Sequence, residues 1–251
     1  MAMQSLSAQN YAFENREGWI DLQIVQHIGL SKWSDISYIN DGLPPPSMTE
    51  VRAVFNYEPF ILPSLGAFVD MGLGIMPAPE MKSFDFSRMP MPNSGTQYYL
   101  REMISESGID KTSAHFKITA GLFGDFEATE KLNIMPYFGV GGLSMPYRKY
   151  EMILKEDGSN MQYNTTYVWS KNSGEGHSSE MLGYLTGRLN FRYKISPKSS
   201  LLLGLEYTYF FDTTNFYGKY SNTFNGNVQR SFEVKGNNMN MLSVSAGISF
   251  R

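Results

Sequence analysis

The sequence of 251 residues contains no cysteine, which excludes disulfide bonds and thiolate metal sites. No apolar run approaches the roughly 20 residues that a membrane-spanning helix needs, so a helical membrane protein is excluded as well. Charged residues make up only 18%, and a net charge of -3 offers no Lys and Arg cluster for nucleic acid. The mean hydropathy of -0.29 resembles that of a soluble protein. A transmembrane β-barrel is still allowed, because its strands alternate lipid-facing and lumen-facing residues and average to modest hydropathy.

Aromatic residues are abundant, with 16 Tyr and 17 Phe in the chain. Membrane barrels use such residues in girdles at the level of the lipid headgroups. The segment 240–251 is apolar on every second position, which predicts a strand with one apolar face and one small or polar face. The apolar positions are Leu242, Val244, Ala246, Ile248 and Phe250, and the intervening ones are Ser243, Ser245, Gly247 and Ser249.

Seven further segments alternate in the same way, and no linker rich in Pro, Gly or Ser divides them. Pro136 lies inside one of these strands and demands an edge or a bulge, because proline cannot donate to the ladder. We expect one domain at 18–251, preceded by a signal remnant or periplasmic segment at 1–17. The predicted strands are 18–30, 48–58, 65–76, 113–126, 132–143, 181–195, 201–211 and 240–251.

Short and long connections alternate along the chain. The short ones are 59–64, 127–131 and 196–199, and the long ones are 31–47, 77–112, 144–180 and 212–238. Outer-membrane barrels have this asymmetry, with short periplasmic turns, long extracellular loops and both termini in the periplasm when the strand number is even. The sequence therefore favours a membrane barrel over the alternative of a soluble β-sandwich or lipocalin-like barrel.

The long loops are expected to carry structure of their own. Asp157-Gly158 and Asn225-Gly226 are strong hairpin signals, so strands should continue above the membrane as hairpin extensions. The segment 97–107 lacks Gly and Pro and is predicted to form a short helix. Counting 147–155 and 161–169 as spanning strands gives an alternative barrel of ten strands.

The segments "MLSVSAGISF", "LNIMPYFGVGGL" and "LLLGLEYTYF" resemble strands of the small Gram-negative outer-membrane β-barrels, the OmpA-, OmpX- and OmpW-like group. The resemblance implies an all-β, antiparallel up-and-down transmembrane barrel of eight strands in the bacterial outer membrane. It also implies contact with outer-membrane lipids and lipopolysaccharide. Phe250 would act as the signal read by the barrel-assembly machinery, although Arg251 follows it where the group usually ends on the aromatic residue.

Charged residues occupy the non-apolar face of the predicted strands. In an eight-stranded barrel they would point into a lumen just wide enough for side chains to fill, and unpaired charges there would be costly. We expect them to pair across the lumen as a structural plug, with a narrow porin-like channel as the alternative. These residues are Asp21, Glu50, Arg52, Asp70, Lys117, Arg188, Arg192 and Glu206.

Aromatic residues in the long loops could form a binding surface, since aromatic anchors dominate contact energies, or could prop the hairpins against each other. The function expected is structural or surface-binding and carried by the loops, with an envelope protein, an envelope complex or a surface glycan as partner. The loop residues are Tyr147, Tyr150, Tyr163, Tyr167, Trp169, Phe216, Tyr217 and Tyr220.

Catalytic signals are weak. The three histidines, His27, His115 and His177, show no metal-ligand spacing, and no phosphate-binding glycine loop follows a strand. His177 and Ser179 form a His-x-Ser pair that could serve as base and nucleophile of a lipid A-modifying hydrolase. We expect a protein that is not an enzyme, with no metal and no cofactor.

Overall fold

The computed structural model describes residues 18–30, 47–58, 64–77, 98–107, 112–146, 148–170, 179–213, 215–222, 228–234 and 238–250. These residues form two antiparallel sheets. No helix among them is long and apolar enough to cross a membrane.

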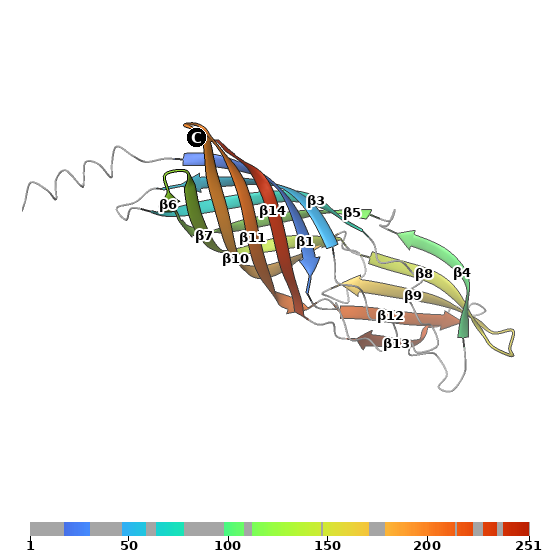
Figure 1. Cartoon of the computed structure of the whole chain (residues 1–251). Coiled ribbons are helices and arrows are strands. Elements are labelled where there is room, and N and C mark those ends of the chain that lie inside the picture. Colours follow the sequence, from blue (N-terminus) through green and yellow to red (C-terminus); the bar gives the residue numbers. More distant parts are fainter. Residues whose placement is uncertain are drawn as a thin grey trace, which may run out of the picture.

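The larger sheet is a closed barrel of eight strands (Figure 1). The first and last strands pair from Ile20 opposite Phe250 to Gly29 opposite Met241. A further pairing between β10 and β7 completes the ring, so the sheet has no open edge. The staves are β1 (Gly18–Gly29), β2 (Ser47–Tyr57), β3 (Leu65–Pro77), β5 (Thr112–Gly124), β7 (Leu132–Pro146), β10 (Ser179–Ser196), β11 (Ser199–Thr213) and β14 (Asn238–Phe250), with β6 (Phe126–Thr129) extending β5.

The prediction of eight spanning strands is therefore confirmed, and most predicted boundaries lie within one or two residues of the observed ones. The strand ends joined by the three short connections all lie at one end of the barrel, which we call the turn end; they are Tyr57 and Leu65, Thr129 and Leu132, and Ser196 and Ser199. The first residue of β1 and the last of β14 lie at this end too. The opposite end is called the loop end.

Alternation along each strand separates inside from outside. In β1 the side chains of Asp21, Gln23 and His27 are buried in the lumen, while Ile24 is 64% exposed on the outer face. Successive side chains of a strand point to opposite faces of the sheet. The apolar residues that alternate with the inward-facing polar residues must therefore face outward. This arrangement is the inverse of a soluble barrel.

Pro136 sits where the ladder between β5–β6 and β7 is interrupted. Pairing with β5 stops at Phe123 opposite Tyr137, and pairing with β6 resumes at Phe126 opposite Ile134. The missing N–H of the proline therefore falls in this gap. The register is the same on both sides of the gap, so the strand has a break in one ladder at the proline rather than the predicted bulge, and its pairing with β10 continues with Leu189 opposite Pro136. The break separates β6 from β5.

A second sheet of five strands lies beyond the loop end (Figure 1). Arg148 follows the last residue of β7 by two positions, and Asn215 follows the last residue of β11 by two, so barrel strands lead almost directly into it. In sheet order the strands are β13 (Val228–Val234), β12 (Asn215–Asn222), β9 (Gln162–Ser170), β8 (Arg148–Glu156) and β4 (Tyr98–Ser107).

Two expectations about the loops are corrected by this sheet. The segment 97–107 is a strand rather than a helix, because pairing with β8 satisfies its backbone groups and overrides its weak local preference. The ten-strand barrel is also wrong, since β8 and β9 pair with β4 and β12 and with no stave of the barrel. The hairpin at Asp157-Gly158 is confirmed, with Gly158 at a φ of 71°.

Candidate functional site

The lumen is filled by side chains in successive layers. Nearest the loop end, apolar residues close it, and each comes from the loop-end part of a different strand. All are at most 1% exposed. They are Met48, Met76, Leu143, Leu182, Phe210 and Met241.

Beneath this apolar layer lies a layer of charges centred on Glu206 of β11. Arg52 donates two hydrogen bonds to its carboxylate, at 2.6 and 3.2 Å. Arg188 donates a third at 2.7 Å through Nε, and the Lys117 ammonium donates another. Thr208 Oγ1 completes the shell at 3.3 Å. One carboxylate thus holds three cations that come from β2, β5 and β10.

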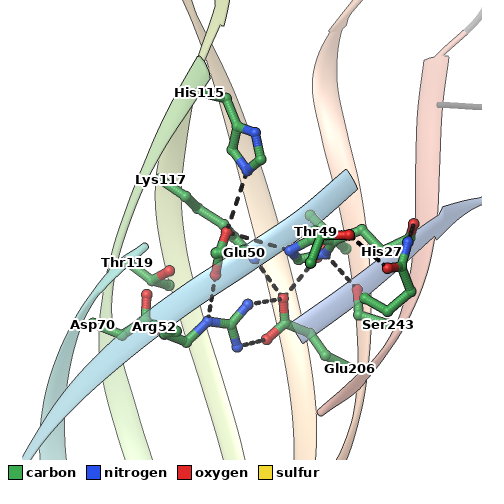
Figure 2. Close-up of polar contacts among 12 residues, drawn as sticks. His27, Thr49, Glu50, Arg52, Asp70, His115, Lys117, Thr119, Glu206 and Ser243 are labelled. Atoms are coloured by element: carbon green, nitrogen blue, oxygen red, sulfur yellow. Dashed lines mark hydrogen bonds and ion pairs between the residues drawn. The ribbon is translucent and has the colours of Figure 1, made fainter. Parts of the chain in front are cut away.

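Glu50 is the second centre of the charged layer. Arg52 Nε donates to its Oε1 at 2.7 Å, while Oε2 lies 3.3 Å from His27 Nε2 and 3.7 Å from His115 Nε2. Figure 2 shows the two imidazoles approaching this carboxylate from different strands. On its other side, His27 Nδ1 lies 2.7 Å from Ser243 Oγ. The side chains of Glu50 and both histidines are at most 1% exposed.

The charges of this layer balance. Asp70 accepts a hydrogen bond from Arg188 Nη2, so three carboxylates face three cations. Because each ion has at least one direct partner of opposite charge, the high cost of burying an isolated charge is offset within the layer. The six residues are Glu50, Asp70 and Glu206 against Arg52, Lys117 and Arg188.

An aromatic cluster fills the lumen nearest the turn end. Trp19 and Phe123 meet edge to face at 5.3 Å, and Phe123 stacks on Tyr137 at 5.2 Å. Such ring pairs add to the stabilisation from burial. The cluster consists of Trp19, Val54, Phe68, Phe123, Met135 and Tyr137.

Polar side chains contact this cluster. The guanidinium of Arg192 lies 4.8 Å from the ring centroid of Trp19 and is hydrogen-bonded to Asp125. Asn56 donates to Asp21 at 2.9 Å and accepts from the Tyr137 hydroxyl at 3.0 Å. The charged layer therefore lies between the apolar layer at the loop end and an aromatic cluster, interleaved with polar groups, at the turn end.

All eight charged residues predicted to face the lumen are buried in it, at 3% exposure or less. The prediction missed His27, His115, Asn56 and Asp125. The first two could have been found, because His27 is six residues from Asp21 and His115 is two from Lys117, so each shares the inward face of a residue already assigned. Asn56 and Asp125 carry the same signal, because Asn56 is four residues from Arg52 and Asp125 is eight from Lys117.

The predicted loop aromatics belong to the second sheet. Only the side chain of Tyr163 is described, and it is 2% exposed, packed edge to face against Tyr98 at 5.7 Å. That contact is structural. Tyr150 is opposite Tyr167, and Phe216 is opposite Trp169, so the register brings four of these positions together. Tyr217 and Tyr220 lie on β12, and Tyr147 lies outside the described residues.

The hydrolase pair is only half described. Ser179 begins β10 opposite Pro146, whereas His177 lies outside the described residues. The hydrolase interpretation therefore stays a prediction. Within the described part of the chain, no group of three or more His, Cys, Asp or Glu side chains is placed to hold a metal ion.

The side chains on the outer face of the barrel indicate whether water or lipid surrounds it. Large apolar side chains cover every stave, among them Val51 at 63% exposed, Leu73 at 67% and Leu203 at 63%. A continuous apolar belt around a closed barrel with buried charges inside is stable in lipid and not in water. The fold is that of a transmembrane β-barrel.

No family model matches the chain, and no curated protein matches it. Solved structures of membrane barrels are similar over nearly its whole length, but with low identity. Neisserial surface protein A is 12% identical with a TM-score of 0.40, and the match covers 93% of this chain and 96% of that one.

Two further structures have the same TM-score. A major outer membrane protein of Thermus thermophilus is 13% identical, with 93% of this chain and 98% of that one covered. Ail of Yersinia pestis, the attachment invasion locus protein, is 11% identical, with 94% and 99% covered. The lipid-facing assignment rests on the side chains of this chain itself.

Proposed function

We propose that this protein is an integral outer-membrane barrel that holds its five-stranded sheet at the cell surface as a structural or binding element. The observation that carries the proposal is that the barrel and the five-stranded sheet are separate sheets with different surroundings. The barrel is filled by a balanced charged layer between an apolar layer and an aromatic cluster, and the remaining described strands form a separate sheet beyond its loop end.

Aromatic residues support placement in the membrane. Near the turn end, Tyr57, Tyr193 and Phe250 are exposed on the outer face, and near the loop end Tyr209 and Phe211 are exposed. Their strand positions put them at the two rims of the apolar belt, where amphipathic rings sit at the headgroup level. With short turns on the periplasmic side, the five-stranded sheet would face the outside of the cell.

Binding by the five-stranded sheet can be tested by deleting residues 148–170, which removes β8 and β9. The probe is the polysaccharide of lipopolysaccharide freed of lipid A, so that acyl chains cannot bind the barrel surface. We expect at least tenfold weaker binding by the deletion variant, because β8 and β9 join β4 to β12. The barrel should still shift in mobility on unheated gels.

The matched control replaces only the hairpin tip at 157–160 with Gly and Ser, which leaves the strands in place. Equal binding by the deletion variant and the intact chain would show that the sheet is not the binding element for this polysaccharide. Loss of the heat-dependent mobility shift would show that the barrel needs the sheet to fold, which contradicts a display role.

A further inference from the structure

One wall of the lumen is built from small side chains. Across β11 and β14, Ser200 is opposite Ser249 and Gly204 is opposite Ser245, so small residues meet at two levels of the wall. The opposite wall, formed by β3 and β5, carries larger inward-facing side chains, among them Phe68, Lys117 and Phe123. The small wall comprises Ser243, Ser245, Gly247 and Ser249 of β14 with Ser200 and Gly204 of β11. Leu202, opposite Gly247, is the one large side chain that faces the lumen between these two levels.

Two buried amides face this wall. Gln23 is 2% exposed and Asn190 is 0% exposed, and neither amide has a hydrogen-bond partner among the described residues. Gln23 is opposite Gly247 in the ladder, and Asn190 is opposite Gly204. A methyl group placed on Gly204 would collide with both Asn190 Oδ1 and Ser245 Oγ. The side chains of Asn190 and Gln23 therefore lie directly over Gly204 and Gly247 of the small wall.

The wall opens at the turn end into a polar recess of about 200 Å³. Ser200, Ser249 and Arg192 line this recess, together with the turn between β10 and β11. Arg192 Nη1 is buried without a hydrogen-bond partner among the described residues. Asp21 lies opposite Ser249 and its carboxylate interacts with the Ser249 hydroxyl, so polar groups continue from the recess to Gln23 and Asn190.

At its inner end the wall reaches the charged layer. Ser243 Oγ lies 2.7 Å from His27 Nδ1, and His27 Nε2 lies 3.3 Å from Glu50 Oε2. Met241, the next lumen-facing residue of β14, is 1% exposed and belongs to the apolar layer at the loop end. A path along the wall would therefore end at Ser243 and His27.

We propose that a hydrated crevice follows the small wall from the turn-end recess to Ser243 and His27 and ends there. Buried amides almost always have a hydrogen-bond partner, and water is the partner that fits a polar space lined by serine and glycine. The crevice would admit water and small hydrophilic molecules from the turn side only. Through it, His27, Glu50 and His115 would exchange protons with the periplasm and not with the outside.

The absence of cysteine allows a direct test by single-cysteine labelling in lipid vesicles. The variants are S249C at the mouth, S245C inside the crevice, M241C beyond its end and A246C on the lipid face. The probe is a small cationic methanethiosulfonate. We expect S249C and S245C to react at least tenfold faster than A246C, and M241C to stay as slow as A246C.

The outcomes separate this proposal from that of the displayed sheet. If S245C reacts as slowly as A246C while S249C reacts, the crevice stops at the mouth and the proposal is wrong. If M241C reacts as fast as S245C, the lumen is open past the charged layer, and a blind crevice is wrong. Neither result depends on what the five-stranded sheet binds. Serine and cysteine are similar in size, and each variant is first checked for the heat-dependent mobility shift.

Discussion

Glu206→Ala is expected to lower the free energy of unfolding by about 3–5 kcal/mol, the usual cost of leaving buried charges without their partner. Arg52, Lys117 and Arg188 all donate to this carboxylate, and the Glu206 side chain is only 3% exposed. Arg52 and Arg188 would keep one carboxylate each, whereas no other ion pair is recorded for Lys117 within the described residues. Urea unfolding in detergent micelles, followed by gel mobility, measures the loss.

The matched control for this variant is Glu127→Gln on β6. Glu127 is also paired with a lysine, at 3.7 Å from Lys194, but its side chain is 61% exposed. Exposed ion pairs contribute about 0–1 kcal/mol, so this variant should unfold at nearly the urea concentration of the unaltered chain. A Glu206→Ala variant as stable as the control would contradict the ion-pair network described for the lumen.

Leu203→Arg is expected to destabilise the barrel by about 2–4 kcal/mol in lipid vesicles, the cost of an arginine at the bilayer midplane on the face of a barrel. Leu203 lies on β11 between the aromatic rims of the apolar belt, points outward and is 63% exposed, beside Phe191 and Ala246 on the neighbouring strands. On a protein surrounded by water, the same substitution at an exposed leucine would change stability little. Refolding yield and urea unfolding in vesicles give the two measurements.

Asn160→Arg provides the comparison for that variant, since it adds the same side chain at an exposed position of the β8–β9 turn, outside the barrel. We expect it to fold into vesicles like the unaltered chain. Equal stability of the two arginine variants would mean that Leu203 faces water, and the outer face would then not be a lipid surface.

Alternation predicted the eight strands, because each has to present opposite chemistry to lipid and lumen. The alternation of short and long connections then favoured a membrane barrel over a soluble one. Asp21 and Ile24 are three positions apart in β1, an odd number, and this spacing is enough to assign their side chains to opposite faces. The sequence could not predict which inward charges meet. Glu206 and Arg52 are 154 residues apart, and their hydrogen bond follows from barrel closure and strand stagger rather than from local pattern.

The five-stranded sheet could not be predicted from the local sequence pattern, for a different reason. The residues of β4 have no strong preference, and their conformation is set by pairing with β8, about 50 residues later in the chain. The hairpin of β8 and β9 could be predicted from Asp157-Gly158, but the partners of its outer edges could not. For the same reason, the aromatic residues of the loops were predicted to cluster without any indication that Tyr163 would be buried against Tyr98.

Single-channel recording in planar bilayers tests the central claim, that the lumen is a closed plug and the barrel serves as an anchor. Because the ions of the charged layer are paired and an apolar layer closes the lumen at the loop end, the refolded protein should insert and show no conductance steps at either polarity in molar salt. Steady, reproducible steps from the unaltered protein would contradict the plug and would identify the barrel as a narrow channel.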